Sequence, residues 1–360
     1  MLPTNGDFIQ RHAEAIDLLH KVTVLHIISD KTISKSRIEN NTINNINTFI
    51  GYIKHTSNPL LKLIRFFKMY KQLINKIAHF DLIHLNVLFP FGLFALYQKI
   101  IKKKPFIISE HWTGYLKPQH KDISFYQKTL SKVITKNAAF ICPVSENLKN
   151  SMLEFGLKGN YYSIPNVVDT NLFFPKNFNE HPFTIIHVSN MNNEHKNISG
   201  MLKVARKLED EIPHFNWKFI GGEADQFSQL IKQLNFKRNS INFINHISQK
   251  ELTNYFQNAN LFVLFSNYEN LPCVILEAFS SGLPVISTDV GGINEYFPDE
   301  FGYLIEKNNQ EELTNKIVDI YNKPLNNKSE MHLYAQNNFS KNQISKSFSH
   351  LYYRSLNIKN

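Results

Sequence analysis

Cysteine is scarce in this chain, and long apolar runs are missing from it. The two cysteines, Cys142 and Cys273, are far apart in sequence, so no disulfide framework is predicted and a reducing compartment fits. No run of about 18 apolar residues occurs, so the sequence predicts no membrane-spanning helix. The first residues do not resemble a signal peptide. We therefore expect a cytoplasmic protein.

Charge is also low. Charged residues make up 19% of the chain, which is below average, and hydrophobic residues make up 42%. This composition is enough for a packed core and excludes a disordered chain. Because 360 residues exceed what one ordinary core holds, we expect two domains.

The charge that is present is mostly basic, with a formal net charge of +10. The best organised basic stretch is 60–76, where Lys and Arg interleave with apolar residues at helical spacing. Such a helix can lie on an anionic membrane surface, or it can pack on a core with a solvated basic face, which we favour. Nucleic-acid binding fits less well, because the basic residues are dispersed and no binding-module motif occurs.

Short apolar, β-branched runs alternate with helical patterns along the chain. This alternation predicts an α/β protein with parallel sheets wrapped by helices. The pattern breaks over 166–182, which is rich in Asn, Pro and Phe and indicates a hinge between two domains. The predicted strands are 22–28, 82–85, 106–109, 139–144, 162–164, 184–188, 217–220, 241–243, 261–264 and 285–287. The predicted helices include 8–19, 146–155, 198–209, 248–258 and 310–321.

The most informative segment runs from 265 to 288. Glu269 and Glu277 are separated by seven residues, Pro272 stands where a helix would begin, and Gly282 stands where it would end. The N-terminus of that helix would offer unpaired N–H groups and the positive end of its dipole to a phosphate. Carboxylates on both sides of an anion site indicate a ligand with hydroxyls and phosphates, such as a nucleotide-sugar.

This segment resembles the E-x7-E signature of glycosyltransferase family 4, the retaining sugar transferases of the GT-B fold. Further matches follow the family's order along the chain. Residues 110–114 (Glu-His-Trp-Thr-Gly) resemble its N-domain histidine loop, and 164–169 (Ile-Pro-Asn-Val-Val-Asp) its interdomain segment. Residues 290–295 (Val-Gly-Gly-Ile-Asn-Glu) resemble its Gly-Gly-x-x-Glu loop.

The resemblance implies a GT-B fold, in which two Rossmann-like domains face a cleft. It places an acceptor-side domain at 1–165, a linker at 166–182, a nucleotide-sugar domain at 183–339, and a helix at 340–360 that crosses back to the first domain. The first strand of the first domain is apparently missing, since only residues 1–4 precede its glycine loop. We expect either a start further upstream or a truncated form.

The resemblance also assigns catalytic roles. Lys196 matches the basic residue that grips the donor diphosphate, where a cation stabilises developing charge. The family's arginine partner, expected near Asn190, is absent. Glu269 lies by the transferred sugar. It could act as a nucleophile, although the resemblance favours donor binding and a front-face displacement. His111 matches a histidine that contacts the donor sugar.

The remaining site residues are expected to bind the donor. Glu277 would hold the ribose, and the glycines would allow a close approach to phosphate or nucleotide unless they are simple turn residues. Pro272 has no N–H to give, so neighbouring backbone groups would contact the ligand. The expected donor-binding residues are Gly6, Asn190, Gly221, Gly222, Asn270, Leu271, Pro272 and Glu277.

No metal site is predicted, because the sequence lacks an Asp-x-Asp motif and its histidines do not fall at ligand spacings. No cofactor is expected, and the donor would be a UDP- or GDP-sugar.

The sequence thus predicts a retaining, metal-independent glycosyltransferase of the hexosyltransferase type. Its partners would be a nucleotide-sugar and a glycan, lipid-linked or small-molecule acceptor. If 60–76 binds a membrane, the protein would act at the inner face of the cell membrane. The expected process is synthesis of a cell-surface polysaccharide or glycoconjugate. Two alternatives stay open: a catalytically degenerate binding or scaffold subunit, and a GT-B nucleotide-sugar epimerase. The Asn-rich stretch 31–58 is either an acceptor loop or a disordered insertion.

Overall fold

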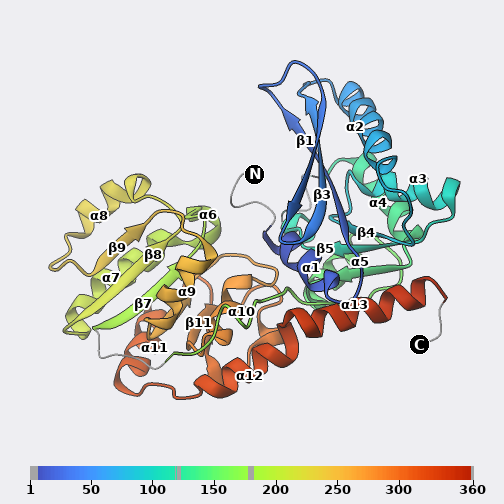
Figure 1. Cartoon of the computed structure of the whole chain (residues 1–360). Coiled ribbons are helices and arrows are strands. Elements are labelled where there is room, and N and C mark those ends of the chain that lie inside the picture. Colours follow the sequence, from blue (N-terminus) through green and yellow to red (C-terminus); the bar gives the residue numbers. More distant parts are fainter. Residues whose placement is uncertain (1–6, 118, 120–122, 177–181, 358–360) are drawn as a thin grey trace. The chain divides into compact units, whose positions relative to one another are not determined.

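A computed structural model describes residues 7–117, 119, 123–176 and 182–357 (Figure 1). The chain divides into two compact units. Unit 1 comprises the described residues of 1–144, 149–164 and 341–360, and unit 2 comprises those of 145–148 and 165–340. Unit 1 is therefore built from both ends of the chain, and most of unit 2 is one continuous insertion.

The strands of unit 1 form two three-stranded sheets. One is parallel in the order β4-β5-β6, and its middle strand β5 is buried along its whole length. The other has the order β1-β3-β2, with β1 parallel and β2 antiparallel to β3. The bounds are β1 Thr23–Asp30, β2 Arg37–Ile43, β3 Ile46–Lys54, β4 Ile83–Asn86, β5 Phe106–Glu110 and β6 Phe140–Pro143.

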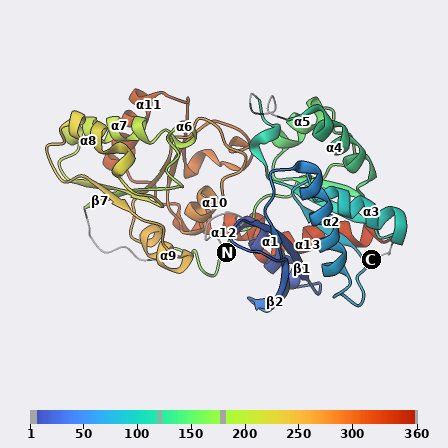
Figure 2. The same ribbon diagram turned by 90° about the horizontal axis from the view of Figure 1, so that it is seen from above.

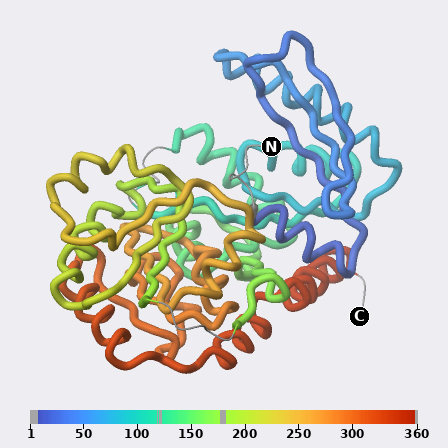
Figure 3. The backbone as a smooth tube through the Cα atoms, turned by 60° about the vertical axis from the view of Figure 1, so that its left-hand side comes forward, coloured from blue at the N-terminus to red at the C-terminus, as the bar shows by residue number. Residues whose placement is uncertain are grey.

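The stretch 31–58 contains a β-hairpin, so its interpretation as a disordered insertion was wrong, and its role as an acceptor loop stays a prediction. Strands β2 and β3 pair up to Ile43 and Ile46 and are joined by Asn44 and Asn45 alone. Both asparagines have positive φ, 46° and 68°, which a two-residue hairpin turn of type I′ needs and which asparagine tolerates. The blue part of the tube in Figure 3 follows this reversal.

Helix α2, Pro59–Ile74, packs on this hairpin sheet through its C-terminal half. Phe66, Met69, Tyr70 and Leu73 join one buried cluster with residues of β1 and β3. The helix lies so close that a Cβ on Gly51 of β3 would come within 2.5 Å of Met69 Cγ. Core packing therefore accounts for half of the amphipathic pattern at 60–76.

The two ends of unit 1 pack together. Helix α1, Asp7–Asp17, lies beside α13, Lys341–Ser355 (Figure 2). Lys341 pairs with Glu14 at 3.0 Å, and His20 Nε2 lies 2.9 Å from the Ser349 hydroxyl. The other described helices with residues in unit 1 are α3 Gly92–Lys102, the 3-10 turn η1 Thr113–Tyr115, α4 Phe125–Asn137 and α5 Glu146–Glu154, whose residues before 149 are assigned to unit 2.

Unit 2 contains a six-stranded parallel sheet in the order β12-β11-β10-β7-β8-β9. From β7 the chain adds β8 and β9 on one side, and from β10 it adds β11 and β12 on the other. This is the order of a doubly wound fold, where ligands bind beyond the carboxyl ends of the strands. The strands are β7 Phe183–Val188, β8 Phe215–Ile220, β9 Ile241–Ile244, β10 Leu261–Leu264, β11 Val285–Thr288 and β12 Gly302–Ile305. Its helices are α6 Asn193–Lys196, α7 Ile198–Glu211, α8 Ser228–Leu234, α9 Gln249–Gln257, α10 Cys273–Ser280, α11 Gln310–Asn322 and α12 Lys328–Phe339, with 3-10 turns η3 Asp225–Phe227, η4 Asn294–Tyr296 and η5 Asp299–Phe301.

Most of the predicted strands are confirmed. The strand predicted at 261–264 is β10 with the same first and last residues, because a fully buried strand has a continuous apolar sequence. The strand predicted at 162–164 was wrong: the segment runs beside β6 and donates hydrogen bonds to it, such as Tyr162 N to Ile141 O at 2.9 Å, and the isolated bridge nearby is at Tyr161. The strand expected to be missing ahead of α1 falls at residues 1–6, outside the described residues.

The two halves of α2 predict different costs of truncation. Leu73 is fully buried, so Leu73→Ala should lower the free energy of unfolding by about 2–5 kcal/mol, the range for a leucine truncated in a core. Leu60 is 67% exposed, and Leu60→Ala is the matched control, with a change within about 0.5 kcal/mol. Urea denaturation followed by circular dichroism measures both. Equal effects of the two variants would contradict the packing described here.

Candidate active site

The segment from 265 to 282 forms a loop and helix after β10. Glu269 is buried at 5% exposure in the loop, and Glu277 is buried at 1% on α10. Helix α10 begins at Cys273 with Pro272 as its N-cap residue, so Pro272 stands where the helix begins, as predicted. Gly282 follows the last turn with φ 66°, as predicted for a helix C-terminus.

Glu269 forms a buried ion pair with Lys196, the last residue of α6. The Lys196 ammonium donates to Oε1 of Glu269, and the Ser266 hydroxyl donates to the same oxygen at 2.7 Å. Burial alone would raise the pKa of Glu269, but the charge of Lys196 and the nearby His195 lower it overall to about 2. Glu269 is therefore an ionised carboxylate at neutral pH.

His195 lies next to this pair. Its ring stacks on Tyr268 with the centroids 4.2 Å apart and the planes 4° from parallel. Its Nε2 lies 3.5 Å from Glu269 Oε1. We call Glu269, Lys196, His195, Ser266 and Tyr268 the Glu269 cluster.

The loops that carry the Glu269 cluster are held together by hydrogen bonds to main-chain carbonyls. Asn267 N donates to the His195 carbonyl at 2.8 Å, and its side-chain amide donates to the Glu194 carbonyl at 2.7 Å. Thr288, at the end of β11, donates to the Ser266 carbonyl at 2.7 Å. Because β11, β10 and β7 are neighbours in the sheet, the loops that follow them meet at one edge.

The Gly-Gly pair after β11 allows its loop to lie against the Glu269 loop. A Cβ on Gly291, whose φ is 66°, would come within 1.9 Å of the Glu269 carbonyl oxygen. A Cβ on Gly292 would come within 2.4 Å of Ser145 Cβ, and Gly292 N donates to the Asn270 carbonyl at 2.9 Å. No side chain fits at either position without moving backbone or a buried neighbour.

The expected donor-binding residues beside Glu269 are held from the main chain. The Asn270 carbonyl accepts from Gly292, and the Leu271 carbonyl accepts from the side chain of Asn166 at 2.6 Å. Both residues are buried. The backbone from Asn270 to Pro272 is therefore fixed ahead of the N-terminus of α10.

Gly221 and Gly222, after β8, lie beside the loop that follows β7. Gly221 has φ 115°, and a Cβ there would come within 2.1 Å of the Ser189 carbonyl oxygen. A Cβ on Gly222 would meet the Met191 side chain at 2.6 Å. Asn190 is exposed in the β7 loop and accepts from Asn192 N at 3.2 Å through its side chain. The conformation of Gly221 requires glycine, which fits both a turn residue and a loop that approaches the nucleotide.

The buried His187, in β7, forms hydrogen bonds that hold the start of the loop after β7. His187 Nδ1 donates to the Val263 carbonyl at 2.9 Å, so we assign its Nε2 as the acceptor from Ser189 at 2.8 Å. The Ser189 hydroxyl in turn accepts from Met191 N at 3.1 Å. Burial lowers the pKa of His187 to about 4. The neutral ring therefore links β10 to the start of the loop that carries His195 and Lys196.

His111 and Gly6, the remaining predicted site residues, belong to the N-terminal part of the chain. Glu110, at the end of β5, is fully buried and accepts from the backbone N–H groups of Leu88 at 3.0 Å, His111 at 2.9 Å and Trp112 at 2.9 Å. Its carboxylate shapes the histidine loop. The His111 ring lies 4.4 Å from Phe8 and 5.0 Å from His12, both on α1. Gly6 lies outside the described residues.

The structure thus brings several of the predicted residues of unit 2 into contact with one another or with one another's loops. Lys196 contacts Glu269, Asn270 contacts the Gly-Gly loop, and Gly221 and Gly222 contact the loop that contains Asn190. His111 lies in unit 1 and is held by that unit's own residues. Sequence reasoning missed the supporting roles of Glu110, His187, His195 and Ser266; the signal for Glu110 was a carboxylate at the end of a strand that begins with the apolar run 106–108.

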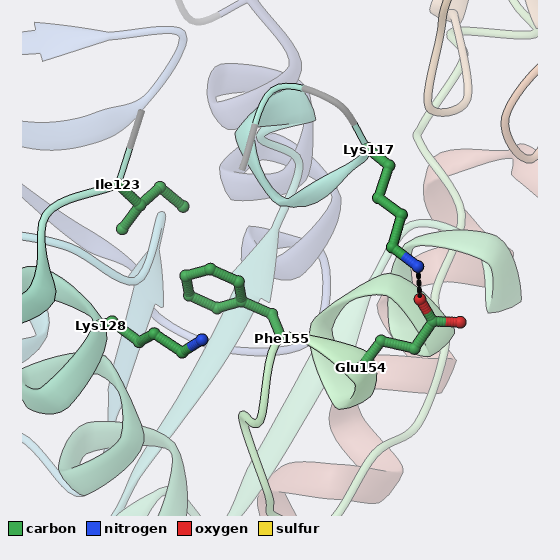
Figure 4. Close-up of a pocket in the computed structure, with 5 residues that line it drawn as sticks. All are labelled: Lys117, Ile123, Lys128, Glu154 and Phe155. Atoms are coloured by element: carbon green, nitrogen blue, oxygen red, sulfur yellow. Dashed lines mark ion pairs between the residues drawn. The ribbon is translucent and has the colours of Figure 1, made fainter. Parts of the chain in front are cut away.

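The pocket in Figure 4 is separate from these residues. It is a hollow of about 340 Å³ on unit 1, lined by Lys117, Ile123, Lys128, Glu154 and Phe155. Lys117 pairs with Glu154 at 2.7 Å, and the Lys128 ammonium lies 4.4 Å from the centre of the Phe155 ring. No predicted site residue lines it.

Within the described part of the chain, no group of three or more His, Cys, Asp or Glu residues is arranged to hold a metal ion. The metal-independent reaction stays a prediction. No helix among the described residues is long and apolar enough to cross a bilayer.

The fold defines the class. A sucrose-phosphate synthase from Thermosynechococcus elongatus matches with a TM-score of 0.78 at 19% identity, over 97% of this chain and 92% of the other. A glycosyltransferase from Rickettsia africae matches with a TM-score of 0.75 at 20% identity, over 99% and 96%. These likenesses show the fold alone, and it is the GT-B fold of glycosyltransferases.

Two family models cover the chain one after the other. Glycosyltransferase Family 4 matches residues 9–172, and Glycosyl transferases group 1 matches residues 168–339. The chain belongs to glycosyltransferase family 4.

Curated relatives agree with this assignment. An uncharacterized glycosyltransferase of Methanocaldococcus jannaschii is 26% identical over 323 residues, which cover 87% of this chain and 84% of the relative. One from Haemophilus influenzae is 29% identical over 168 residues, covering 45% of this chain. That match spans 46% of the Haemophilus protein, less than half of its length.

The buried His187 predicts acid sensitivity of unit 2. The unfolded chain takes up the proton near pH 6.5 and the folded chain only near pH 4, so this stabilisation is complete above pH 6.5 and is lost as the pH falls toward 4. The loss amounts to about 3 kcal/mol at most. His187→Asn should reduce this slope, measured by urea denaturation between pH 7 and pH 4.5.

The exposed His246→Asn is the control for the substitution itself. Parallel stability curves for the natural chain and His187→Asn would contradict the assignment of this acid sensitivity to His187.

Proposed function

We propose that the chain transfers a sugar from a nucleoside-diphosphate sugar, with retention, to a glycan, lipid-linked or small-molecule acceptor. The observation that carries this proposal is the buried pair of Glu269 and Lys196 at the carboxyl edge of the unit 2 sheet. A carboxylate for sugar hydroxyls and a cation for a diphosphate are the two groups that such a donor requires. Among the proteins of like fold, Anabaena HepE has been solved in complex with UDP-glucose, with a TM-score of 0.68 at 16% identity.

In this proposal each group of unit 2 has a distinct task. Lys196 and the N-terminus of α10 stabilise the charge of the departing diphosphate. Glu277, on α10, holds the ribose of the donor. The main chain at Asn270 and Leu271 is immobilised by Gly292 and Asn166, so it meets the donor in one conformation.

We assign Glu269 to donor positioning. Its Oε1 already accepts from Lys196 and from Ser266, which makes it a poor nucleophile. Retention would then follow from attack on the same face that the diphosphate leaves, as the family resemblance implies. His111, held by the Glu110 loop in unit 1, would complete the contacts to the donor sugar.

Helix α2 supports a further part of the proposal, contact with a membrane surface from the cytoplasmic side. Its N-terminal half leaves apolar side chains outside the core, with Leu60 67% and Ile64 55% exposed. Lys62 and Lys68 lie on the same helix, and basic residues beside exposed apolar ones bind anionic lipid surfaces. An acceptor carried on a lipid, in polysaccharide or glycoconjugate synthesis, would be reached there.

The donor site is tested by thermal stabilisation. UDP, GDP and their sugar conjugates should raise the melting temperature selectively for one base, because a ligand that binds only the folded state stabilises it by about 2.7 kcal/mol at a hundred times its Kd. Lys196→Ala and Glu277→Gln should abolish most of that shift. Failure of every nucleotide to shift the natural chain would argue for a degenerate scaffold, and transfer by Lys196→Ala at the natural rate would contradict the role of Lys196.

The membrane contact is tested by co-sedimentation with vesicles. The natural chain should pellet with phosphatidylglycerol vesicles and much less with phosphatidylcholine vesicles, and the double variant Leu60→Asp/Ile64→Asp should stay in the supernatant. Leu333→Asp, at a residue of unit 2 that is 55% exposed, is the matched control. Equal pelleting of both variants would remove α2 from the proposal.

A further inference from the structure

His195 is the member of the Glu269 cluster to which neither the sequence nor the proposed function gives a task. It precedes Lys196 on α6, and its ring is stacked on Tyr268. Its Nε2 is buried and, among the described residues, has no hydrogen-bond partner within normal distance. That nitrogen faces Oε1 of Glu269 at 3.5 Å.

Without Lys196, the carboxylate of Glu269 would keep the Ser266 hydroxyl as a donor but would lose its cation. It is buried, and an uncompensated buried charge costs several kcal/mol. Its cation in this structure is Lys196. If Lys196 turns toward the diphosphate of a donor, as the proposed function requires, Glu269 loses that partner just when it has to orient the sugar.

We propose that His195 is a positioning residue that takes over Glu269 Oε1 when Lys196 engages the donor diphosphate. This inference rests on the proposed function. The two side chains would exchange at one oxygen, so the buried carboxylate keeps a second donor beside the Ser266 hydroxyl throughout. His195 acts through Glu269 and Lys196 and touches neither the diphosphate nor the reacting bond.

The exchange needs little movement. Closing the distance from 3.5 Å to a hydrogen bond of about 2.9 Å is a shift well below the length of a bond. The backbone of His195 is held at both ends, since its N–H donates to Asn192 Oδ1 at 3.0 Å and its carbonyl accepts from Asn267 at 2.8 Å. An imidazole that carries a proton on Nε2 is sufficient for this hydrogen bond.

The competing explanation is that the ring of His195 only packs on Tyr268. Two variants distinguish this packing role from the proposed donor role. His195→Phe keeps a flat ring for the stack and removes the donor nitrogen, whereas His195→Gln removes the ring and keeps an N–H donor that can reach the carboxylate. A packing role predicts that the phenylalanine variant is the better one, and a donor role predicts the glutamine variant.

The experiment measures binding by calorimetry to the whole chain, with UDP and GDP compared with uridine and guanosine. His195→Phe should weaken binding of the diphosphate by about tenfold, because Lys196 stays held by Glu269, and should leave binding of the nucleoside unchanged. His195→Gln should stay within about threefold of the natural chain. The reverse order of the two variants would overturn the inference.

A double variant tests whether His195 works through Lys196. In a Lys196→Ala chain, His195→Phe should cause no further loss of diphosphate binding, since the side chain to be released is gone. A further loss of about tenfold would show that His195 acts on the ligand by itself and would overturn the inference. If the natural chain bound neither diphosphate, the proposed function would fail and this inference with it.

Discussion

The structure of unit 2 at its ligand edge depends on one buried carboxylate. Glu269 is removed from water, and a charge in that position has to be surrounded by donors. Lys196 reaches it from the loop after β7, and Ser266 from its own loop. The loop after β11 lies against the loop of Glu269 because Gly291 and Gly292 let the main chains touch. Each of these loops starts at the carboxyl end of a neighbouring strand, so the order of the sheet is what makes the arrangement possible.

Support for the site reaches down into the core. His187 lies in β7, fully buried, and joins the Val263 carbonyl of β10 to the hydroxyl of Ser189. In unit 1 the buried Glu110 does a comparable task for the loop of His111, with three backbone N–H groups on one carboxylate. In both units a polar group that never meets solvent sets the path of a loop that is expected to meet ligand. The precision of a site of this kind comes from such supports.

The sequence predicted the features that have a repeated pattern or a strong local signal. The buried strands of unit 2, the GT-B fold and the helix that begins between the two glutamates follow from apolar runs, alternation and the Pro and Gly at the helix ends. The hairpin at 37–54 was missed, although Asn44-Asn45 between alternating residues is a turn signal, because the Asn content of the whole chain masked it. The contacts of His195 and His187 could not be predicted, since they join residues about 75 positions apart whose meeting depends on strand order alone.

The division of the chain between the units has a consequence for synthesis. Helix α13 belongs to unit 1 and packs on α1, while the residues between 165 and 340 form unit 2. During translation the segment for unit 2 is complete before α13 leaves the ribosome, so unit 2 can close its sheet while α1 still lacks its neighbour. The N-terminal part of the chain, made first, finishes last, and its exposed apolar face has to be kept from other chains for the whole time that unit 2 is being made.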